Sequence, residues 1–241
     1  MAKTYEAIQK SQEISTENSV TSSYLRHWNF LNLRGKKNLA DILSNICIEQ
    51  ESNGSKVFHF ASALSGEGTS TILINLANFV MGDNSPNNIL FIDGNFENPV
   101  FHLAFDLPPL PGLSEILKKE ANLSQAVHRL ESSSVYIMTC GNTLLGNHIS
   151  LESRALLDLV KALRQNFEII IFDSPPLLCS SISIEWANAA DVSFMVIETN
   201  RNQWEVARKA QNLLENNNCK VGGVVLNRVQ YSIPRWLYKR L

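Results

Sequence analysis

The chain has 241 residues, 44% of them hydrophobic, and its formal net charge is -2. A chain of this length can bury the full core of one large α/β domain. The charge balance excludes the strongly basic character that bulk nucleic-acid binding normally requires. No window reaches the ~18–20 apolar residues of a membrane-spanning helix, so we expect any membrane role to depend on a partner or a surface patch.

The N-terminal segment, residues 1–34, is rich in Ser, Thr, Glu, Gln and Asn, and we expect much of it to be mobile. Residues 1–20 hold no apolar stretch, so we do not expect this segment to be a signal peptide. Residues 24–31, with Tyr24 and Trp28, are too apolar for a free linker. We therefore expect this patch to dock on the domain or on a partner.

The rest of the chain alternates between two hydrophobic patterns. Apolar residues at helical spacing predict helices over residues 37–49, 70–81, 114–117 extending toward 129, 151–166 and 203–216. Short β-branched or aromatic runs predict strands at 57–61, 89–92, 135–139, 169–172, 192–197 and 221–226. Apolar strands that alternate with helices indicate a mostly parallel, doubly wound α/β sheet with helices on both faces. Ligands bind such sheets at the carboxyl ends of the strands.

The four cysteines form no CxxC pair, and each lies in or beside an apolar run. We interpret them as small buried residues in a reducing cytosol: Cys47, Cys140, Cys179 and Cys219. The five histidines show no metal-ligand spacing, and we interpret them as structural.

A glycine-rich segment follows the first predicted strand and precedes a predicted helix. Gly66 and Gly68 permit a tight turn whose N–H groups, together with those of the helix, can point at one anion. Ser70 stands where a hydroxyl would ligate Mg²⁺, but Thr69 occupies the usual lysine position. The alternative is an ordinary strand-to-helix turn. The candidate nucleotide-binding residues here are Ser65, Gly66, Glu67, Gly68, Thr69, Ser70 and Thr71.

Two further strands are each followed by an acid. Asp93 comes directly after residues 89–92, and Asp173 comes directly after residues 169–172. A carboxylate just past the sheet edge is where a metal-linked acid belongs in phosphate-binding folds. Aspartate is also common at strand ends as a turn or cap residue. Both acids and the glycine loop together predict a phosphate and metal site formed by Ser70, Asp93 and Asp173.

These motifs together resemble the bacterial tyrosine kinases that control capsule and exopolysaccharide assembly, within the MinD/ParA-like deviant P-loop ATPases. The resemblance covers residues 57–228. The family loop S-A-L-P-G-E-G-K-S-T corresponds to residues 62–71, D-A-D-L-R-R-P to 93–99, G-L-x-x-x-L to 112–117, D-x-P-P to 173–176, and V-L-N-R to 225–228. The resemblance implies a P-loop NTPase-like fold, and it places Asn227 near the adenine, with Arg228 beside it as a further candidate for nucleotide binding.

The departures from the family pattern fall on charged catalytic positions. Thr69 replaces the loop lysine, Asn95 replaces the second acid, Glu97 replaces an arginine, and Ile182 stands where a further family aspartate falls. Phosphoryl transfer depends on charge stabilisation and positioning, so these losses predict a degenerate site with no confident catalytic residue. Asp93 and Asp173 are then relic positions, and ATP or ADP with Mg²⁺ should bind weakly at best.

The resemblance implies a cytoplasmic protein that reaches the inner face of the plasma membrane through a partner, a membrane polysaccharide chain-length or export protein. We expect residues 35–230 to form the P-loop NTPase-like domain and 231–241 a basic, aromatic tail. This chain has no convincing match to the family's C-terminal tyrosine cluster or to its N-terminal assembly segment. A homo-oligomer is therefore possible but does not follow from the resemblance. Two alternatives are an active autokinase of the same pathway and a MinD/ParA-like positioning ATPase.

Overall fold

The computed structural model describes residues 33–54, 56–82, 87–131, 133–143, 153–199 and 204–228. Seven strands form one sheet in the order β3-β4-β2-β5-β1-β6-β7. Only β3 runs antiparallel to its neighbour, and every other pairing is parallel. The strands are β1 Val57–Ser62, β2 Ile89–Asp93, β3 Val127–Arg129, β4 Val135–Met138, β5 Ile169–Asp173, β6 Val192–Glu198 and β7 Val221–Asn227.

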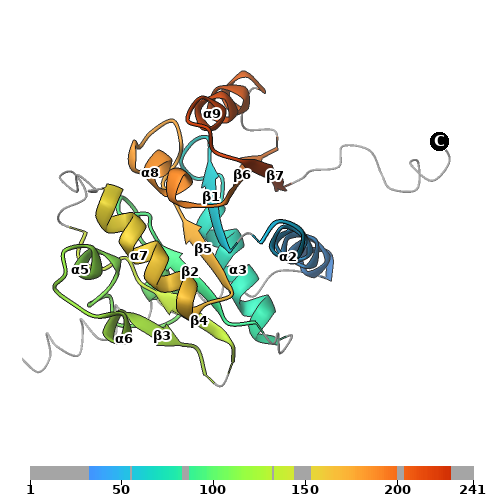
Figure 1. Cartoon of the computed structure of the whole chain (residues 1–241). Helices are drawn as coiled ribbons and strands as arrows, with labels where there is room; N and C mark the ends of the chain where they lie inside the picture. Colours follow the sequence, from blue (N-terminus) through green and yellow to red (C-terminus); the bar gives the residue numbers. More distant parts are fainter. Residues whose placement is uncertain are drawn as a thin grey trace, which may run out of the picture.

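Helices cover both faces of the sheet (Figure 1). They are α2 Leu33–Asn53, α3 Thr69–Gly82, α4 Phe101–Ala104, α5 Leu113–Leu117, α6 Leu123–Ala126, α7 Ser153–Asn166, α8 Ile182–Ala189 and α9 Trp204–Asn216. Apolar residues of α2 and α3 pack with one set of strand side chains. Those of α7 and α8 pack with the alternate set, and α9 packs beside them. This arrangement confirms the predicted doubly wound α/β fold.

The central strands are buried along their whole length, which explains why the sequence shows them as continuous apolar runs. Every residue of β1, β2 and β5 is buried. A strand whose two faces are both covered by helices needs apolar residues on each of them. All six predicted strands are present, and each ends within one residue of its predicted end.

The predicted helix that extends from residue 114 toward 129 is wrong. Lys119 adopts a left-handed conformation with φ 63° after α5, and this turn ends the helix. A second short helix, α6, then begins after Asn122, whose N–H donates to Gln125 Oε1 at 2.9 Å. Residues Val127–Arg129 form β3 at the sheet edge. The sequence conceals this break, because the apolar residues of α5 and α6 keep helical spacing across it.

The cysteine prediction holds only in part. Cys140 is buried, Cys47 and Cys219 are partly exposed, and Cys179 is exposed. Cys179 lies in a turn after β5, where the chain runs over the surface. The patch at residues 24–31 and the tail at 231–241 lie outside the described residues. No helix in the described ranges combines the length and apolar character needed to cross a membrane.

Candidate functional site

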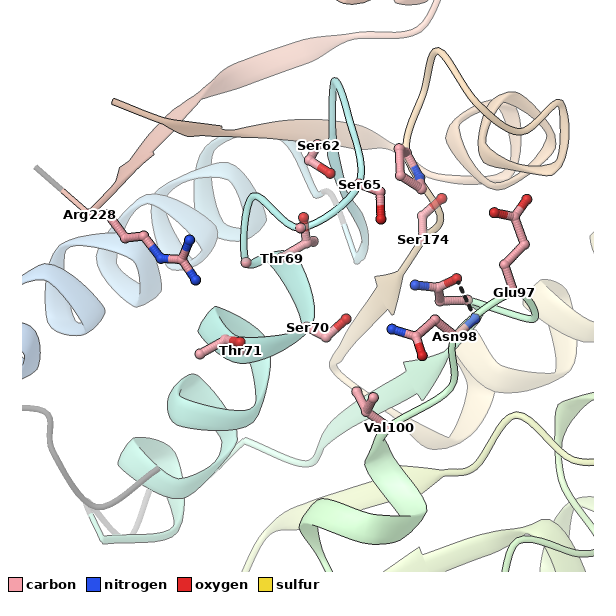
Figure 2. Close-up of a pocket in the computed structure, with 14 residues that line it drawn as sticks. Ser62, Ser65, Thr69, Ser70, Thr71, Glu97, Asn98, Val100, Ser174 and Arg228 are labelled. Carbon is pink, nitrogen blue, oxygen red and sulfur yellow. Dashed lines mark hydrogen bonds between the residues drawn. The ribbon is translucent and has the colours of Figure 1, made fainter. Parts of the chain in front are cut away.

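The carboxyl ends of β1, β2 and β5 meet at a pocket of about 310 Å³ beside the start of α3. Its volume lies at the lower end of the range for small-molecule sites. Figure 2 shows hydroxyl groups of the loop and of α3 around this pocket, with Glu97 and Arg228 on opposite sides of the view. The lining residues are Ser62, Ser65, Gly66, Gly68, Thr69, Ser70, Thr71, Asn95, Glu97, Asn98, Val100, Ser174, Pro176 and Arg228.

The loop between β1 and α3 is held in shape from beneath by Glu67. Its side chain is fully buried, and its carboxylate accepts hydrogen bonds from the N–H groups of Leu64 at 2.8 Å and Glu198 at 3.1 Å. The Asn227 side chain donates to the Glu67 carbonyl at 2.8 Å. The Glu67 side chain therefore organises the loop, and the predicted contact of Glu67 with a nucleotide is wrong, because the whole residue is buried and is not among those that line the pocket. The sequence alone gave no signal for this role.

The two loop glycines occupy conformations that other residues rarely adopt. Gly66 has φ 83° and Gly68 has φ 95°, both in the region that favours glycine. A Cβ atom on Gly68 would lie 2.3 Å from Asn227 Nδ2, so the site has no room for a side chain there. The loop passes directly into the 14-residue helix α3. A glycine turn followed by a helix N-terminus forms a cradle for an anion such as phosphate.

Thr69 occupies the position of the missing lysine, at the first residue of α3. Its side chain is buried, and its hydroxyl has no hydrogen-bond partner among the described residues. An unsatisfied buried hydroxyl costs about 1–3 kcal/mol, which a bound oxyanion would recover. Threonine can donate a hydrogen bond to phosphate, but it cannot supply charge. Among the described residues that line the pocket, Arg228 is the one base and Glu97 the one acid.

Asp93 and Asp173 are register partners on β2 and β5, and both are fully buried. The Asp93 carboxylate accepts hydrogen bonds from the N–H groups of Val100 and Phe101 at 2.9 Å and from Asn95 at 3.3 Å. Burial raises the pKa of Asp93 to about 6, although these N–H groups favour its charged form. Asp93 therefore fixes the turn that leads from β2 into α4.

Asp173 lies in a different environment, because neither of its carboxylate oxygens has a hydrogen-bond partner among the described residues. Burial raises the pKa of Asp173 well above its usual value, and the neighbouring Asp93 charge raises it further. The nearby Ser70 hydroxyl and Ser174 N–H oppose this shift only in part. Two buried carboxyl groups side by side repel each other when both are charged, which favours a proton or a cation between them.

The residues present fit a divalent cation. Mg²⁺ prefers carboxylate and hydroxyl oxygens. The Ser70 hydroxyl lies near enough to the Asp173 carboxyl to lower its pKa, although it does not meet the geometry of a hydrogen bond. These two residues would hold the ion, with Asp93 contributing mainly charge because its oxygens already accept backbone hydrogen bonds. The three residues predicted from sequence as a metal site thus lie together.

Asn95 and Glu97 follow β2 at the opposite wall of the pocket. The Asn95 side-chain oxygen accepts a hydrogen bond from the Asn98 N–H at 3.2 Å, drawn as the dashed line in Figure 2. The amide at position 95 therefore stabilises the turn, and it cannot take up a proton as a carboxylate would. Glu97 is exposed and brings negative charge to the wall where the family has a cation.

Trp186 supports this turn from α8, and sequence reasoning missed it. The fully buried indole stacks on Phe172 and Phe96 with ring centroids 5.0 and 6.1 Å apart. Its Nε1–H donates to the Gly94 carbonyl at 3.1 Å. A Cβ atom on Gly94 would lie 2.7 Å from the Asp173 carbonyl. The Asp93–Gly94 pair at the strand end was the one local signal that a close contact lies here.

Arg228 follows β7 at the edge of the pocket. Its backbone has φ 52°, and its N–H donates to the Asn227 side-chain oxygen at 2.9 Å. The guanidinium pairs with the Glu198 carboxylate at 3.0 Å. Thr199 donates its hydroxyl to the Arg228 carbonyl at 3.0 Å. Asn227, predicted from the resemblance, is thus bonded to the loop at Glu67, and Arg228 is linked to the loop through Asn227.

Comparison with known proteins gives relatives along most of the chain, although no family model matches. The chain is 30% identical over 186 residues to the tyrosine-protein kinase YwqD of Bacillus subtilis, covering 77% of this chain and 78% of that protein. It is 26% identical over 204 residues to the tyrosine-protein kinase CpsD of Streptococcus pneumoniae, covering 83% and 88%.

Solved structures agree with this relationship. The crystal structure of the chimerical protein CapA2B2 has a TM-score of 0.75 and 26% identity, covering 87% of this chain and 91% of that one. MinD of Pyrococcus horikoshii, complexed with Mg-ADP, shares the fold with a TM-score of 0.61 and 20% identity, covering 77% and 76%. The fold is the one that the sequence resemblance predicted. The chain belongs to the family of bacterial tyrosine-protein kinases.

Proposed function

We propose that this protein is a catalytically degenerate member of its family, which binds nucleotide weakly and regulates or scaffolds a membrane protein of capsule or exopolysaccharide chain-length control or export. The observation that carries the proposal is Thr69, a buried neutral side chain at the position where phosphoryl transfer needs a cation. The phosphate cradle of Gly66 and Gly68 is retained, while the charges that drive the reaction are not.

Replacement of the loop lysine by Thr69 should lower the rate of phosphoryl transfer strongly. One electrostatic contact to the transition state is worth about 3–4 kcal/mol, or roughly 10²–10³ in rate. Asn95 adds a second loss, because its amide is engaged with the Asn98 N–H and cannot act as a base. Glu97 adds repulsion toward a nucleotide phosphate. An active autokinase would need a replacement cation, and Arg228 is the one described residue of the lining that offers it.

Nucleotide binding is supported by the hydroxyl groups, the glycine turn and the helix N-terminus. These groups give hydrogen bonds to phosphate without a loop cation. Asp173 and Ser70 supply oxygen ligands for Mg²⁺, whose charge would offset that of the phosphates. We expect ADP or ATP to bind with a dissociation constant well above the micromolar range typical of tight nucleotide sites.

The membrane partner is the part of the proposal that needs a cellular test. Each basic residue near an anionic surface contributes about 1 kcal/mol, screened by salt, so Arg235, Lys239 and Arg240 would give only marginal binding without help. We expect membrane fractions to retain the protein only when the partner, a chain-length or export protein, is present.

Fractionation of cells with and without that partner provides the test. Deleting residues 233–241 should weaken membrane association modestly, while deleting the partner should release the protein to the cytosol. A protein that stayed fully membrane-bound without the partner, and was released only by loss of the tail, would replace this model with a direct anchor.

A further inference from the structure

We propose that Arg228 takes over part of the role of the missing loop lysine: it binds the diphosphate of a nucleotide in the pocket, and Glu198 tempers its charge. The inference rests on the proposed nucleotide binding and goes further, because it assigns a cation and a ligand group. Arg228 is the one basic residue among the described residues that line the pocket. Its guanidinium extends in Figure 2 toward the start of α3, where Thr69 and Thr71 lie.

The backbone fixes where the Arg228 side chain begins. Asn227, the preceding residue, contacts the loop directly, because its Nδ2 donates to the Glu67 carbonyl and sits where a Cβ atom of Gly68 would be. The Asn227 side-chain oxygen then accepts the Arg228 N–H. Arg228 is therefore anchored through a single residue to the glycine that precedes α3, the place where a phosphate would bind.

Glu198 holds the guanidinium close to this position. The two groups are 3.0 Å apart, with the Glu198 side chain 15% and the Arg228 side chain 59% exposed. The Glu198 N–H donates a hydrogen bond to the Glu67 carboxylate at 3.1 Å. The same buried acid therefore holds both the loop and the backbone of Glu198, which forms the ion pair with Arg228. The more exposed partner is the arginine, which is free to exchange one anionic contact for another at small cost.

A guanidinium suits this role chemically. It presents a planar fork of donors that matches two phosphate oxygens at once and remains charged at all relevant pH values. Thr69, at the start of α3, has a buried hydroxyl without a hydrogen-bond partner among the described residues, so a phosphate at the cradle would accept from this hydroxyl as well as from the guanidinium. Because binding must draw Arg228 partly away from Glu198, the arginine compensates only incompletely for a loop lysine.

The alternative for Arg228 is stacking on the nucleobase, which an arginine at the rim of a pocket also does well. The two roles differ in what they recognise. A base-stacking arginine matters for ADP and not for inorganic pyrophosphate, whereas a phosphate-binding arginine matters for both.

Calorimetric titration with ADP and with inorganic pyrophosphate, each in metal-free buffer, tests the inference. Arg228→Ala should weaken both ligands about tenfold, the loss of one charge-assisted contact at a partly exposed site. Glu198→Gln should tighten both by roughly threefold, because a competing anion is removed. Thr69→Lys in the Arg228→Ala background should restore the lost affinity. Arg208→Ala, which removes the same charge from the exposed face of α9, should change neither.

Each outcome decides the inference. Weakening of ADP alone by Arg228→Ala would assign the residue to the base and overturn the phosphate role. Unchanged affinity for both ligands in a wild type that binds them would also overturn it, while leaving weak nucleotide binding intact. Absence of any binding to the wild type would remove this inference and the nucleotide site together, and the degenerate-kinase proposal would then depend on the turnover measurement alone.

Discussion

Replacing Asp173 by asparagine should stabilise the protein in metal-free buffer at pH 7.5. The Asp173 side chain is fully buried, its oxygens have no hydrogen-bond partner among the described residues, and its register partner is a second buried carboxyl, Asp93. An uncompensated buried charge costs several kcal/mol, and the nearby Ser70 and Ser174 donors reduce this only in part. We expect Asp173→Asn to raise the free energy of unfolding by about 2 kcal/mol, which for a domain of this size shifts Tm upward by about 4–8 °C.

The pH dependence of this gain has a definite sign. Burial raises the pKa of both carboxyls, that of Asp93 from 3.8 to about 6 and that of Asp173 well above 3.8. At a pH between the pKa of a carboxyl in the unfolded chain and its higher pKa in the folded protein, the folded state still holds a proton that the unfolded state has released. The free energy of unfolding of the wild type therefore falls as pH rises from about 4. Asp173→Asn removes one of the two contributions, and its advantage should therefore shrink as pH falls toward 4.

Thermal and denaturant unfolding, followed with and without Mg²⁺, provide the assay. Mg²⁺ should raise the Tm of the wild type and leave that of Asp173→Asn nearly unchanged, because the variant lacks the proposed carboxylate ligand. Asp158→Asn is the matched control: Asp158 is exposed on α7 and makes only a 3.9 Å pair with Lys161, so it should change stability by less than about 0.5 kcal/mol. If Asp173→Asn were less stable than the wild type at pH 7.5 without metal, the buried Asp173 carboxyl would not be destabilising in the folded protein.

Two further predictions concern the loop. Thr69→Lys alone should leave ATP turnover far below the ~1 per second of a working kinase, because Asn95 cannot supply the second carboxylate. Thr69→Lys combined with Asn95→Asp should improve the binding of Mg-nucleotide. A normal turnover rate in the single variant would contradict the role given to Asn95. Gly68→Ala should destabilise the protein and weaken phosphate binding, because its Cβ would lie 2.3 Å from Asn227 Nδ2 at φ 95°. Gly54→Ala, at φ 65° with open space around it, should cost only the conformational strain of about 1–2 kcal/mol, and equal losses in both variants would argue against a crowded cradle.

Patterns local to each element were enough to predict the fold. Strands such as β5 are apolar throughout because helices cover both faces, and the glycine turn and strand-end acids mark the edge where ligands bind. The break between α5 and α6 was missed because Lys119 adopts a left-handed conformation without being glycine. A cap formed by Asn122 and Gln125 was the readable signal that a new helix begins there.

The interior of the site could not be predicted, because its key contacts join residues far apart in the sequence. Glu67 reaches the Glu198 N–H across 131 residues, and Trp186 reaches the Gly94 carbonyl across 92. Neither side chain has a periodic or compositional signature. The sequence also shows Asp93 and Asp173 at the ends of their strands. It does not show that only Asp93 accepts hydrogen bonds, because these come from the turn that follows β2.

In the function proposed for this protein, the pocket retains a phosphate cradle without the charges for phosphoryl transfer. Incubation of the purified chain with Mg²⁺ and ATP labelled at the γ-phosphate measures this most directly, with released phosphate and labelled tyrosine followed in the same samples. We expect hydrolysis indistinguishable from buffer and no tyrosine labelling, in the wild type and in Asp173→Ala alike. Metal-dependent tyrosine labelling that disappears in Asp173→Ala would contradict this expectation.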